Sequence, residues 1–377
     1  MKILPKELIL PPRTITRAGA VTDLLDECTS FGKRGILVHG QSLERSGFLE
    51  RILSKCPDNL TVTAWRYPGG EPTLDQVEYL LATARKNRAE WIAGVGGGSV
   101  LDVAKACAGL MHAFLPPLAY HDGAPIEPSQ VPFIAVPTTA GTGSESTIVS
   151  VLTNAKTGVK KSIRHPSFIA RSIILDPQLL ASCPKNVIAY SGLDAFTQAI
   201  ESFVSIFATW FSEEISLKAV ALISSSLEAV FCGEKKGNAL NLLTGSYLAG
   251  IALSHARLGV VHGLAHPLGV RYQAPHGLVC AVCLPYVIEF NREAISEKYE
   301  RMNTVIGGDL LAKTQHFLDV LGLESPFAGK PVQNRKWIVE ETLASGSTAA
   351  NPRPVTAKDV EYLLEKIFQP RLFVGSE

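Results

Sequence analysis

The chain has 377 residues, of which 46% are hydrophobic and 19% are charged, and its formal net charge at pH 7 is +1. This length exceeds what one hydrophobic core usually supports, so we expect two domains. The composition excludes a disordered protein, and the nearly balanced charge predicts neither a nucleic-acid partner nor a membrane surface.

The seven cysteines, an odd number, lie mostly inside apolar runs such as AKACAGL, which indicates reduced core thiols and a cytoplasmic protein. Cys280 and Cys283 form a CxxC pair inside the apolar run GLVCAVCLPYVI, and we interpret both as core residues rather than as a redox pair. The N-terminal segment MKILPKELILPPR lacks the pattern of a secretion signal. No apolar run reaches the roughly 18 residues that cross a bilayer.

In the first half of the chain, short apolar runs alternate with amphipathic patterns. The apolar runs predict strands, and the amphipathic patterns predict helices. The predicted strands are 33–40, 90–97, 132–139 and 172–180, and the predicted helices are 74–87 and 99–112. Such alternation is typical of a doubly wound parallel sheet, so we expect an α/β, Rossmann-like domain over residues 1–184.

From Val187 onward the periodicity is almost entirely helical, after a break near Cys183 to Lys185. Apolar residues recur three and four positions apart, as on one face of a helix. The segments with this pattern are 189–205, 213–231, 238–256, 296–308 and 356–368. We therefore expect an all-helical domain over residues 185–377, with Thr356 as the N-cap of its last helix.

Glycines follow one predicted strand and open the next predicted helix, in the run Gly96, Gly97, Gly98 and Ser99. Glycine lets a backbone approach a phosphate closely, and a helix N-terminus supplies unpaired N–H groups. The segment PTTAGTGSES, residues 137–146, also follows a strand and carries hydroxyls among glycines. Two strand ends at one edge of a sheet predict a nucleotide site, the alternative being ordinary turn chemistry.

One carboxylate and three histidines in the second half have the character of a divalent-metal site: Asp194, His262, His266 and His276. If VVHGLAHPL is helical, His262 and His266 project from one face. His276 would then come from the next turn or helix start. For any one of these histidines alone, a structural role in the helical interior is the alternative.

These motifs together resemble the iron-containing (group III) alcohol dehydrogenase family. The resemblance rests on GGGSVLDVAKA, PTTAGTGSE, GLDAFTQAIESFVS, VHGLAHPLG with PHG, and NPRPVTAKDVEYLLEK, and it runs over essentially the whole chain. It implies a dehydroquinate synthase-like architecture: a Rossmann-like nucleotide domain, an all-helical domain, and an active site in the cleft between them. It also implies an NAD(P)-dependent enzyme that forms a homodimer or a higher homo-oligomer.

Carried over residue by residue, the resemblance implies that Asp194, His262 and His276 are metal ligands. His266 would line the substrate and nicotinamide pocket, and it is our candidate for catalytic proton transfer. The family's fourth ligand is a histidine one turn after the aspartate, where this chain has Gln198. Because an amide oxygen is a poorer ligand than imidazole, both metal affinity and the choice between Fe²⁺ and Zn²⁺ stay open.

The cofactor-binding residues implied by the resemblance follow three strands. They are Gly40, Ser42, Gly96, Gly97, Gly98, Ser99, Asp102, Thr138, Thr139, Thr142 and Lys160. NAD-preferring relatives carry an aspartate at the position of Gly40, where it binds the ribose and repels a 2′-phosphate. Its absence favours NADP(H) over NAD(H), with Ser42 or His39 as donors to the phosphate.

The reaction implied is hydride transfer between the nicotinamide and a carbonyl carbon of a small alcohol or carbonyl substrate, with the metal as Lewis acid. Arg257 and Arg271 flank the histidine segment and hint at an acidic substrate. The alternatives are a metal-independent reductase like the related maleylacetate reductases, a lyase like the related dehydroquinate synthases, and a catalytically silent nucleotide-binding protein.

Overall fold

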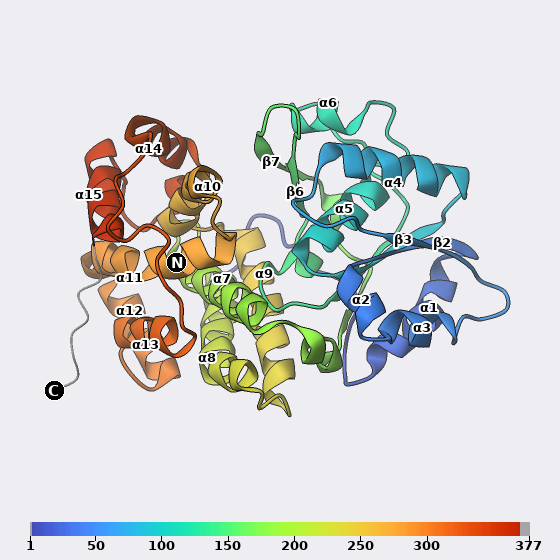
Figure 1. The fold of residues 1–377 in the computed structure, drawn as a ribbon, viewed down its shortest axis with the longest axis horizontal. Helices are drawn as coiled ribbons and strands as arrows, with labels where there is room; N and C mark the ends of the chain where they lie inside the picture. Colours follow the sequence, from blue (N-terminus) through green and yellow to red (C-terminus); the bar gives the residue numbers. More distant parts are fainter. Residues whose placement is uncertain (1, 370–377) are drawn as a thin grey trace. The chain divides into compact units, whose positions relative to one another are not determined.

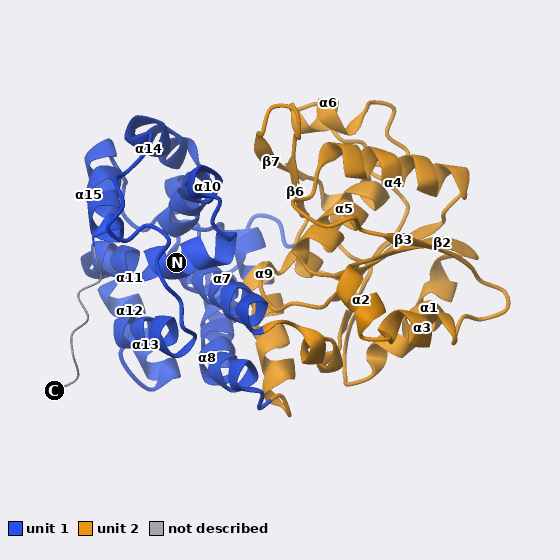
Figure 2. Cartoon of the chain, in the orientation of Figure 1, with its two compact units in different colours: residues 1–8, 185–234, 251–377 blue, residues 9–184, 235–250 orange. Residues whose placement is uncertain are grey.

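A computed structural model describes residues 2–369, and the outermost residues of the two expected domains, 1 and 370–377, lie outside the described part (Figure 1). The chain divides into two compact units (Figure 2). One holds residues 9–184 and 235–250, and the other holds residues 1–8, 185–234 and 251–377. The helix α9 (Asn238–Ala256) is therefore shared between the two units.

Within the described residues, the first unit is built on a parallel sheet with the strand order β1-β8-β5-β4-β2-β3. The chain passes from β2 to β3 on one side and returns to β4 on the other side of β2. In doubly wound sheets, ligands bind at such a reversal of strand order, which here lies at the carboxyl ends of β2 and β4. The strands are β1 (Thr14–Thr16), β2 (Arg34–His39), β3 (Thr61–Arg66), β4 (Trp91–Gly96), β5 (Phe133–Pro137) and β8 (Ser172–Leu175).

Helices cover both faces of this sheet, as Figure 1 shows. Successive strand residues alternate between the faces: Ile92 packs with side chains of α4 and α5, whereas Ala93 packs with those of α1 and α3. Because both faces are buried, the central strands β2, β4, β5 and β8 are apolar along most of their length, and this is why short apolar runs predicted them. The helices are α1 (Leu24–Cys28), α2 (Gln41–Arg45), α3 (Phe48–Leu53), α4 (Leu74–Lys86), α5 (Gly98–Gly109) and α6 (Pro117–His121).

The expected α/β domain is confirmed, with differences in detail. The predicted strand 172–180 ends at Leu175, because Asp176 caps a short 3-10 helix that follows it. Strands β1 and β3 were not predicted, because β1 is short and β3 is partly exposed, so neither forms an apolar run in the sequence. The antiparallel pair β6 (Val149–Thr153) and β7 (Lys160–Arg164) was also not predicted, since its polar residues conceal the strand pattern.

The second unit is helical, and α11 lies at its centre against α7, α10, α13 and α15. Gly277, at the start of α11, permits a close approach to α7, since a Cβ there would lie 2.2 Å from the carbonyl oxygen of Tyr190. The expected N-cap is confirmed, because Thr356 accepts a hydrogen bond from the Asp359 N–H. The helices are α7 (Lys185–Val204), α8 (Trp210–Cys232), α10 (Val260–Tyr272), α11 (His276–Asn291), α12 (Ser296–Ile306), α13 (Leu310–Val320), α14 (Arg335–Ala344) and α15 (Ala357–Phe368).

Within residues 2–369, α8 is long and apolar enough to cross a membrane by length and composition, with a mean hydropathy of 1.6 over 18 residues. The expectation that no continuous apolar run reaches roughly 18 residues is not contradicted, because Glu214, Lys218 and Glu228 interrupt the apolar sequence of α8. In the structure α8 packs against α7 and α12, and Ala219, Val220 and Ile223 are fully buried. A helix at the core of a helical unit has the same composition as a membrane span.

Candidate functional site

Three helices of the second unit bring the predicted metal ligands together. Asp194 lies on α7, His262 on the first turn of α10, and His276 at the first position of α11. The histidine segment is helical, and of the two positions considered for His276, the next turn or a helix start, the structure has the helix start. α7 ends more than 50 residues before α10 begins, whereas α10 and α11 are consecutive, so the packing of α7 against them creates the cluster.

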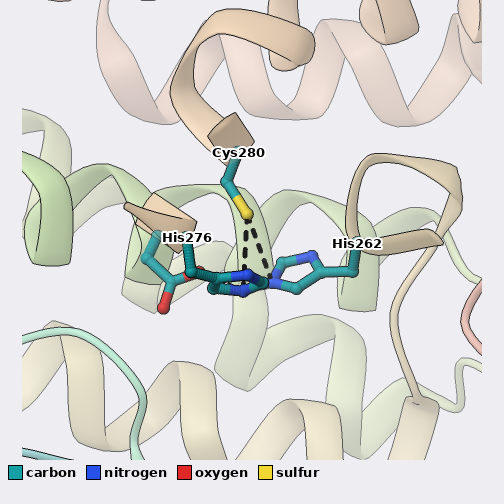
Figure 3. Close-up of side chains that lie close together, drawn as sticks. His262, His276 and Cys280 are labelled. Carbon is teal, nitrogen blue, oxygen red and sulfur yellow. Dashed lines mark hydrogen bonds and ion pairs between the residues drawn. The ribbon is translucent and has the colours of Figure 1, made fainter. Parts of the chain in front are cut away.

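The donor atoms of these residues face one another. Oδ1 of Asp194 lies 3.3 Å from Nε2 of His262 and 3.7 Å from Nε2 of His276. A fourth group, the thiol of Cys280, points at both imidazoles from one turn further along α11 (Figure 3). Its Sγ lies 3.6 Å from Nε2 of His276 and 3.9 Å from Nε2 of His262. The four donor atoms all lie within 4.8 Å of one another, as in a metal site.

The cluster is buried on one side and open on the other. The side chains of Asp194 and His262 are 6% and 7% exposed, whereas that of His276 is 42% exposed. Cys280 is fully buried. His276 therefore lies on the exposed side of the cluster.

Glu201, two turns after Asp194 on α7, orients His262. Its Oε2 accepts a hydrogen bond from Nδ1 of His262 at 2.6 Å, and its Oε1 accepts one from the Val261 N–H at 2.6 Å. The second bond places a carboxylate at the N-terminus of α10, where it is electrostatically favoured. Nδ1 of His262 thus donates to Glu201, and Nε2 is the ring nitrogen directed into the cluster, the arrangement usual for metal-binding histidines.

Charges within the cluster stabilise one another. Burial raises the pKa of the Asp194 carboxyl, but the hydrogen bond from His262 and the charge of His276 outweigh it and lower that pKa overall. Burial lowers the pKa of His262, but the charges of Cys280 and Glu201 raise it well above its usual range. The charge of Cys280 raises the pKa of His276 against the effect of burial. Burial raises the pKa of Cys280, yet the two histidines bring it below its usual value. Positive charge among these donors is thus favoured, which is what a cation supplies.

Gln198 lies one turn after Asp194, as expected, and its amide nitrogen donates to Oδ2 of Asp194 at 3.1 Å. Its Oε1 is buried and makes no hydrogen bond within the described residues. In this rotamer Gln198 holds the carboxylate rather than presenting its oxygen beside it.

The other polar residues near this segment have separate contacts. His266 follows His262 by one turn on α10 and is partly exposed. Arg271 donates to Oε1 of Gln333 at 2.7 Å, and the guanidinium of Arg257 lies 4.5 Å from the ring centre of Phe207.

In the first unit, the predicted cofactor residues gather at the reversal of strand order. Gly40 and Ser42 follow β2, and the run from Gly96 to Ser99 starts at the last residue of its neighbour β4. The N–H of Gly40 donates to the Val95 carbonyl at 3.2 Å, so the two strand ends lie side by side. Ser42 is exposed. The position is the one at which doubly wound sheets bind nucleotides.

The loop after β5 packs on the loop after β4. The N–H of Thr138 donates to the Gly96 carbonyl at 3.0 Å. A Cβ on Gly97 would lie 3.4 Å from the Thr139 side chain, and one on Gly98 would lie 2.7 Å from Cγ2 of Thr142. A side chain at Gly98 would therefore force Thr142 to move, whereas one at Gly97 would make ordinary contact, and the partly exposed backbone where α5 begins is available to a phosphate.

Asp102 and Lys160 make contacts within the protein. The Asp102 carboxylate accepts hydrogen bonds from Oγ of Ser144 at 2.5 Å and from the Val151 N–H at 3.1 Å, and it thereby anchors the glycine-rich loop. Nζ of Lys160, on β7, lies 2.6 Å from Oε2 of Glu71.

Two family models match the chain over nearly its whole length. The model of iron-containing alcohol dehydrogenases matches residues 11–177, and that of the C-terminal region of the Fe-containing alcohol dehydrogenase family matches residues 188–368. The chain belongs to the iron-containing alcohol dehydrogenase family. It is accordingly an oxidoreductase acting on CH–OH groups, from a family that uses a metal, a nicotinamide cofactor and small alcohol or aldehyde substrates.

Similar proteins agree with this assignment. The chain is 34% identical over 304 residues to the probable alcohol dehydrogenase EutG of Escherichia coli (strain K12), covering 80% of this chain and 77% of that one. A solved structure of 1,3-propanediol oxidoreductase aligns with a TM-score of 0.89 at 27% identity, over 96% of this chain and 99% of that one. The structure of sulfoacetaldehyde reductase from Bifidobacterium kashiwanohense, in complex with NAD+, aligns with a TM-score of 0.90 at 25% identity, over 96% of this chain and 98% of that one.

Sequence reasoning missed two residues of this dehydrogenase's cluster. Glu201 carries a signal in its spacing, since it stands seven residues after Asp194 and so on the same face of a helix. Cys280 stands four residues after His276, again on one face, but the apolar run around it led to its interpretation as a core residue. The i, i+4 relation to a candidate ligand was the signal to follow.

Proposed function

We propose that this dehydrogenase interconverts a small alcohol and its aldehyde or ketone, using one divalent metal held by Asp194, His262 and His276. The observation that supports it is the spacing of the donor atoms. Nitrogen and oxygen ligands about 2.0 to 2.2 Å from one metal, at tetrahedral angles, lie about 3.3 to 3.6 Å apart. The separations from Oδ1 of Asp194 to the two imidazole nitrogens, 3.3 and 3.7 Å, fit that geometry.

The protein's own residues have separate tasks in this proposal. When bound, the metal supplies a Lewis acid for the substrate oxygen while hydride passes between the nicotinamide and the carbon. Glu201 keeps Nε2 of His262 directed into the cluster. The exposed side of His276 admits the substrate. We assign His266 to proton exchange with solvent, because imidazole titrates near neutral pH.

The proposal is tested by metal analysis together with NADPH oxidation against a panel of small aldehydes. His262→Ala should lose both metal and activity. His316→Ala is the matched control, because His316 is a half-exposed histidine of the same unit that pairs with Glu228. Equal metal content in wild type and His262→Ala would refute the ligand assignment.

We also propose that NADP(H) is preferred over NAD(H). Position 40, directly after β2, is a glycine and so carries no carboxylate that would repel a 2′-phosphate. Ser42, two residues further on, is exposed. Arg66 stands opposite His39 in the β2–β3 register and places a guanidinium at the same edge, where it also balances Glu44 at 3.5 Å. His39 is buried, so Ser42 and Arg66 are the better donors to a 2′-phosphate.

The second candidate is a metal-independent reductase, and Gln198 is the observation that favours it, because it removes one imidazole from the family's ligand set. Activity that survives chelation and dialysis would support this candidate.

An acidic carbonyl compound belongs in the substrate panel, since a relative from Bilophila wadsworthia, 34% identical over 241 residues, is a sulfoacetaldehyde reductase. A cytoplasmic location fits the seven cysteines, all of which are free.

A further inference from the structure

Cys280 occupies the position of a fourth donor in the cluster. Four residues separate it from His276, so both side chains leave the same face of α11 and converge (Figure 3). Sγ of Cys280 is 3.6 and 3.9 Å from the two imidazole Nε2 atoms. For a metal with bonds of about 2.3 Å to sulfur and about 2.0 Å to nitrogen, tetrahedral angles place these atoms about 3.5 Å apart. The thiol thus lies within a few tenths of an ångström of a ligand's position.

Gln198, the alternative donor, is directed differently. Its amide nitrogen donates to Oδ2 of Asp194 and leaves Oδ1 toward the imidazoles. Presenting Oε1 to the metal requires a rotation that breaks this hydrogen bond. An amide oxygen is also a weaker donor to Zn²⁺ than a thiolate. Both the geometry and the chemistry therefore favour Cys280 over Gln198.

We propose that Cys280, as a thiolate, is the fourth protein ligand of the metal, which is thus held by one carboxylate, two imidazoles and one thiolate. The inference rests on the proposed function in requiring that Asp194, His262 and His276 bind a metal. Ligation breaks the S–H bond of Cys280 and releases one proton to the buffer as the metal–sulfur bond forms. Because thiolates prefer Zn²⁺ to harder cations such as Mn²⁺ and Mg²⁺, the chain should select zinc or Co²⁺ over them.

The test uses the full-length protein, stripped of metal and reconstituted with Co²⁺, whose thiolate complexes show a sulfur-to-metal charge-transfer band in the near ultraviolet. Wild type should show this band at one Co²⁺ per chain. Cys280→Ser should lose it and bind Co²⁺ at least about tenfold more weakly, since losing even an outer partner of a ligand costs that much. Cys283→Ser is the matched control: it removes a second buried thiol of α11 and should keep the band.

A double variant distinguishes loss of the thiolate ligand from misfolding of Cys280→Ser. Gln198→His combined with Cys280→Ser restores four strong ligands, and it should regain affinity without regaining the band. Cys280→Ala with an unchanged melting temperature serves the same purpose.

The outcomes separate the two proposals. Stoichiometric Co²⁺ in wild type without the band overturns ligation by Cys280 while leaving the metal site in place. A band that persists in Cys280→Ser overturns it as well. If Gln198→Ala, rather than Cys280→Ser, weakens binding, the amide is the fourth ligand. If wild type binds no Co²⁺ or Zn²⁺ at all, the metal assignment of the proposed function fails together with the thiolate.

Discussion

The carboxylate of Glu201, on α7, binds both the ring of His262 and the N-terminus of α10. Its Oε2 lies 2.6 Å from Nδ1 of His262, and its Oε1 lies 2.6 Å from the backbone nitrogen of Val261. The side chain of Glu201 is 4% exposed, so water does not compete for these bonds. The orientation of His262 is therefore set by a residue that has no access to the substrate.

We predict that Glu201→Gln lowers metal affinity about 10- to 100-fold, because the amide keeps the shape of the side chain but loses the charge that orients and polarises the imidazole. Competition with a chelator of known affinity measures the change. Glu213→Gln is the control, since Glu213 is an equally buried carboxylate of α8 that pairs with Lys298 and Arg301. If both variants weaken the metal equally, the effect is one of general stability.

We predict that Glu145→Gln flattens the dependence of stability on pH. Burial raises the pKa of Glu145 to about 7 from 4.5. A carboxyl whose pKa is higher in the folded state contributes stability that is complete below the unfolded pKa and is lost as pH rises through the folded pKa. Wild type should therefore lose up to about 3 kcal/mol between pH 4.5 and 7 through this group.

Denaturant unfolding at a series of pH values measures this effect. The variant should lack this loss, whereas Glu127→Gln, which changes an exposed carboxyl, should keep it. Lys105, whose burial lowers its pKa to about 8, titrates above the window. If the free energy of unfolding depends on pH in the same way for wild type and Glu145→Gln, ionisation of Glu145 does not destabilise the folded state, and the prediction is wrong.

The sequence predicted what local patterns encode. Strands buried on both faces gave apolar runs. The glycines at residues 96–98 marked a helix start at a strand end, where a Cβ on Gly96 would lie 2.5 Å from Val100 and one on Gly98 would lie 2.7 Å from Thr142. A metal site was predicted from the carboxylate and the histidines themselves, and the resemblance to a family then indicated Asp194, His262 and His276 as the ligands. Spacing alone says nothing about α7 packing against α11.

What escaped prediction depends on contacts between distant segments. The role of Cys280 is decided by the rings that face it, and an apolar sequence around a cysteine does not reveal them. The contacts of the Asp102 carboxylate with Ser144 and Val151, which lie more than 40 residues away, are not encoded in local spacing, and the place of Asp102 at the cofactor stays a prediction. The division of α9 between two units likewise follows from packing, because its sequence reads as one continuous helix.

We predict that Gly250→Ala destabilises the protein by about 1 to 3 kcal/mol, the usual cost of overpacking. A Cβ there would lie 2.3 Å from Oγ of Ser146 and 2.6 Å from the carbonyl oxygen of Gly143. The gain of about 1 kcal/mol in helix propensity does not offset a clash with backbone. Thermal unfolding measures the loss, and Gly308→Ala, which adds a methyl group in open space, should change little. An unchanged melting temperature for Gly250→Ala would mean that the loop after β5 moves away freely.

We predict that wild type uses NADPH at least about tenfold more efficiently than NADH in kcat/KM, since charge-assisted hydrogen bonds to the 2′-phosphate contribute about 1.5 to 3 kcal/mol. Gly40→Asp should reverse this preference. The backbone of Gly40 has a φ of −85°, and a Cβ there meets nothing closer than 3.5 Å, so the aspartate fits without strain. Gly40→Ala adds the same Cβ without the charge and should keep NADPH preferred. Arg66→Gln should reduce the preference for NADPH over NADH, because it removes a cation at the end of β3. Equal efficiency with both cofactors in wild type would contradict the NADP(H) assignment, and because hydride transfer itself would persist, it would leave the dehydrogenase reaction intact.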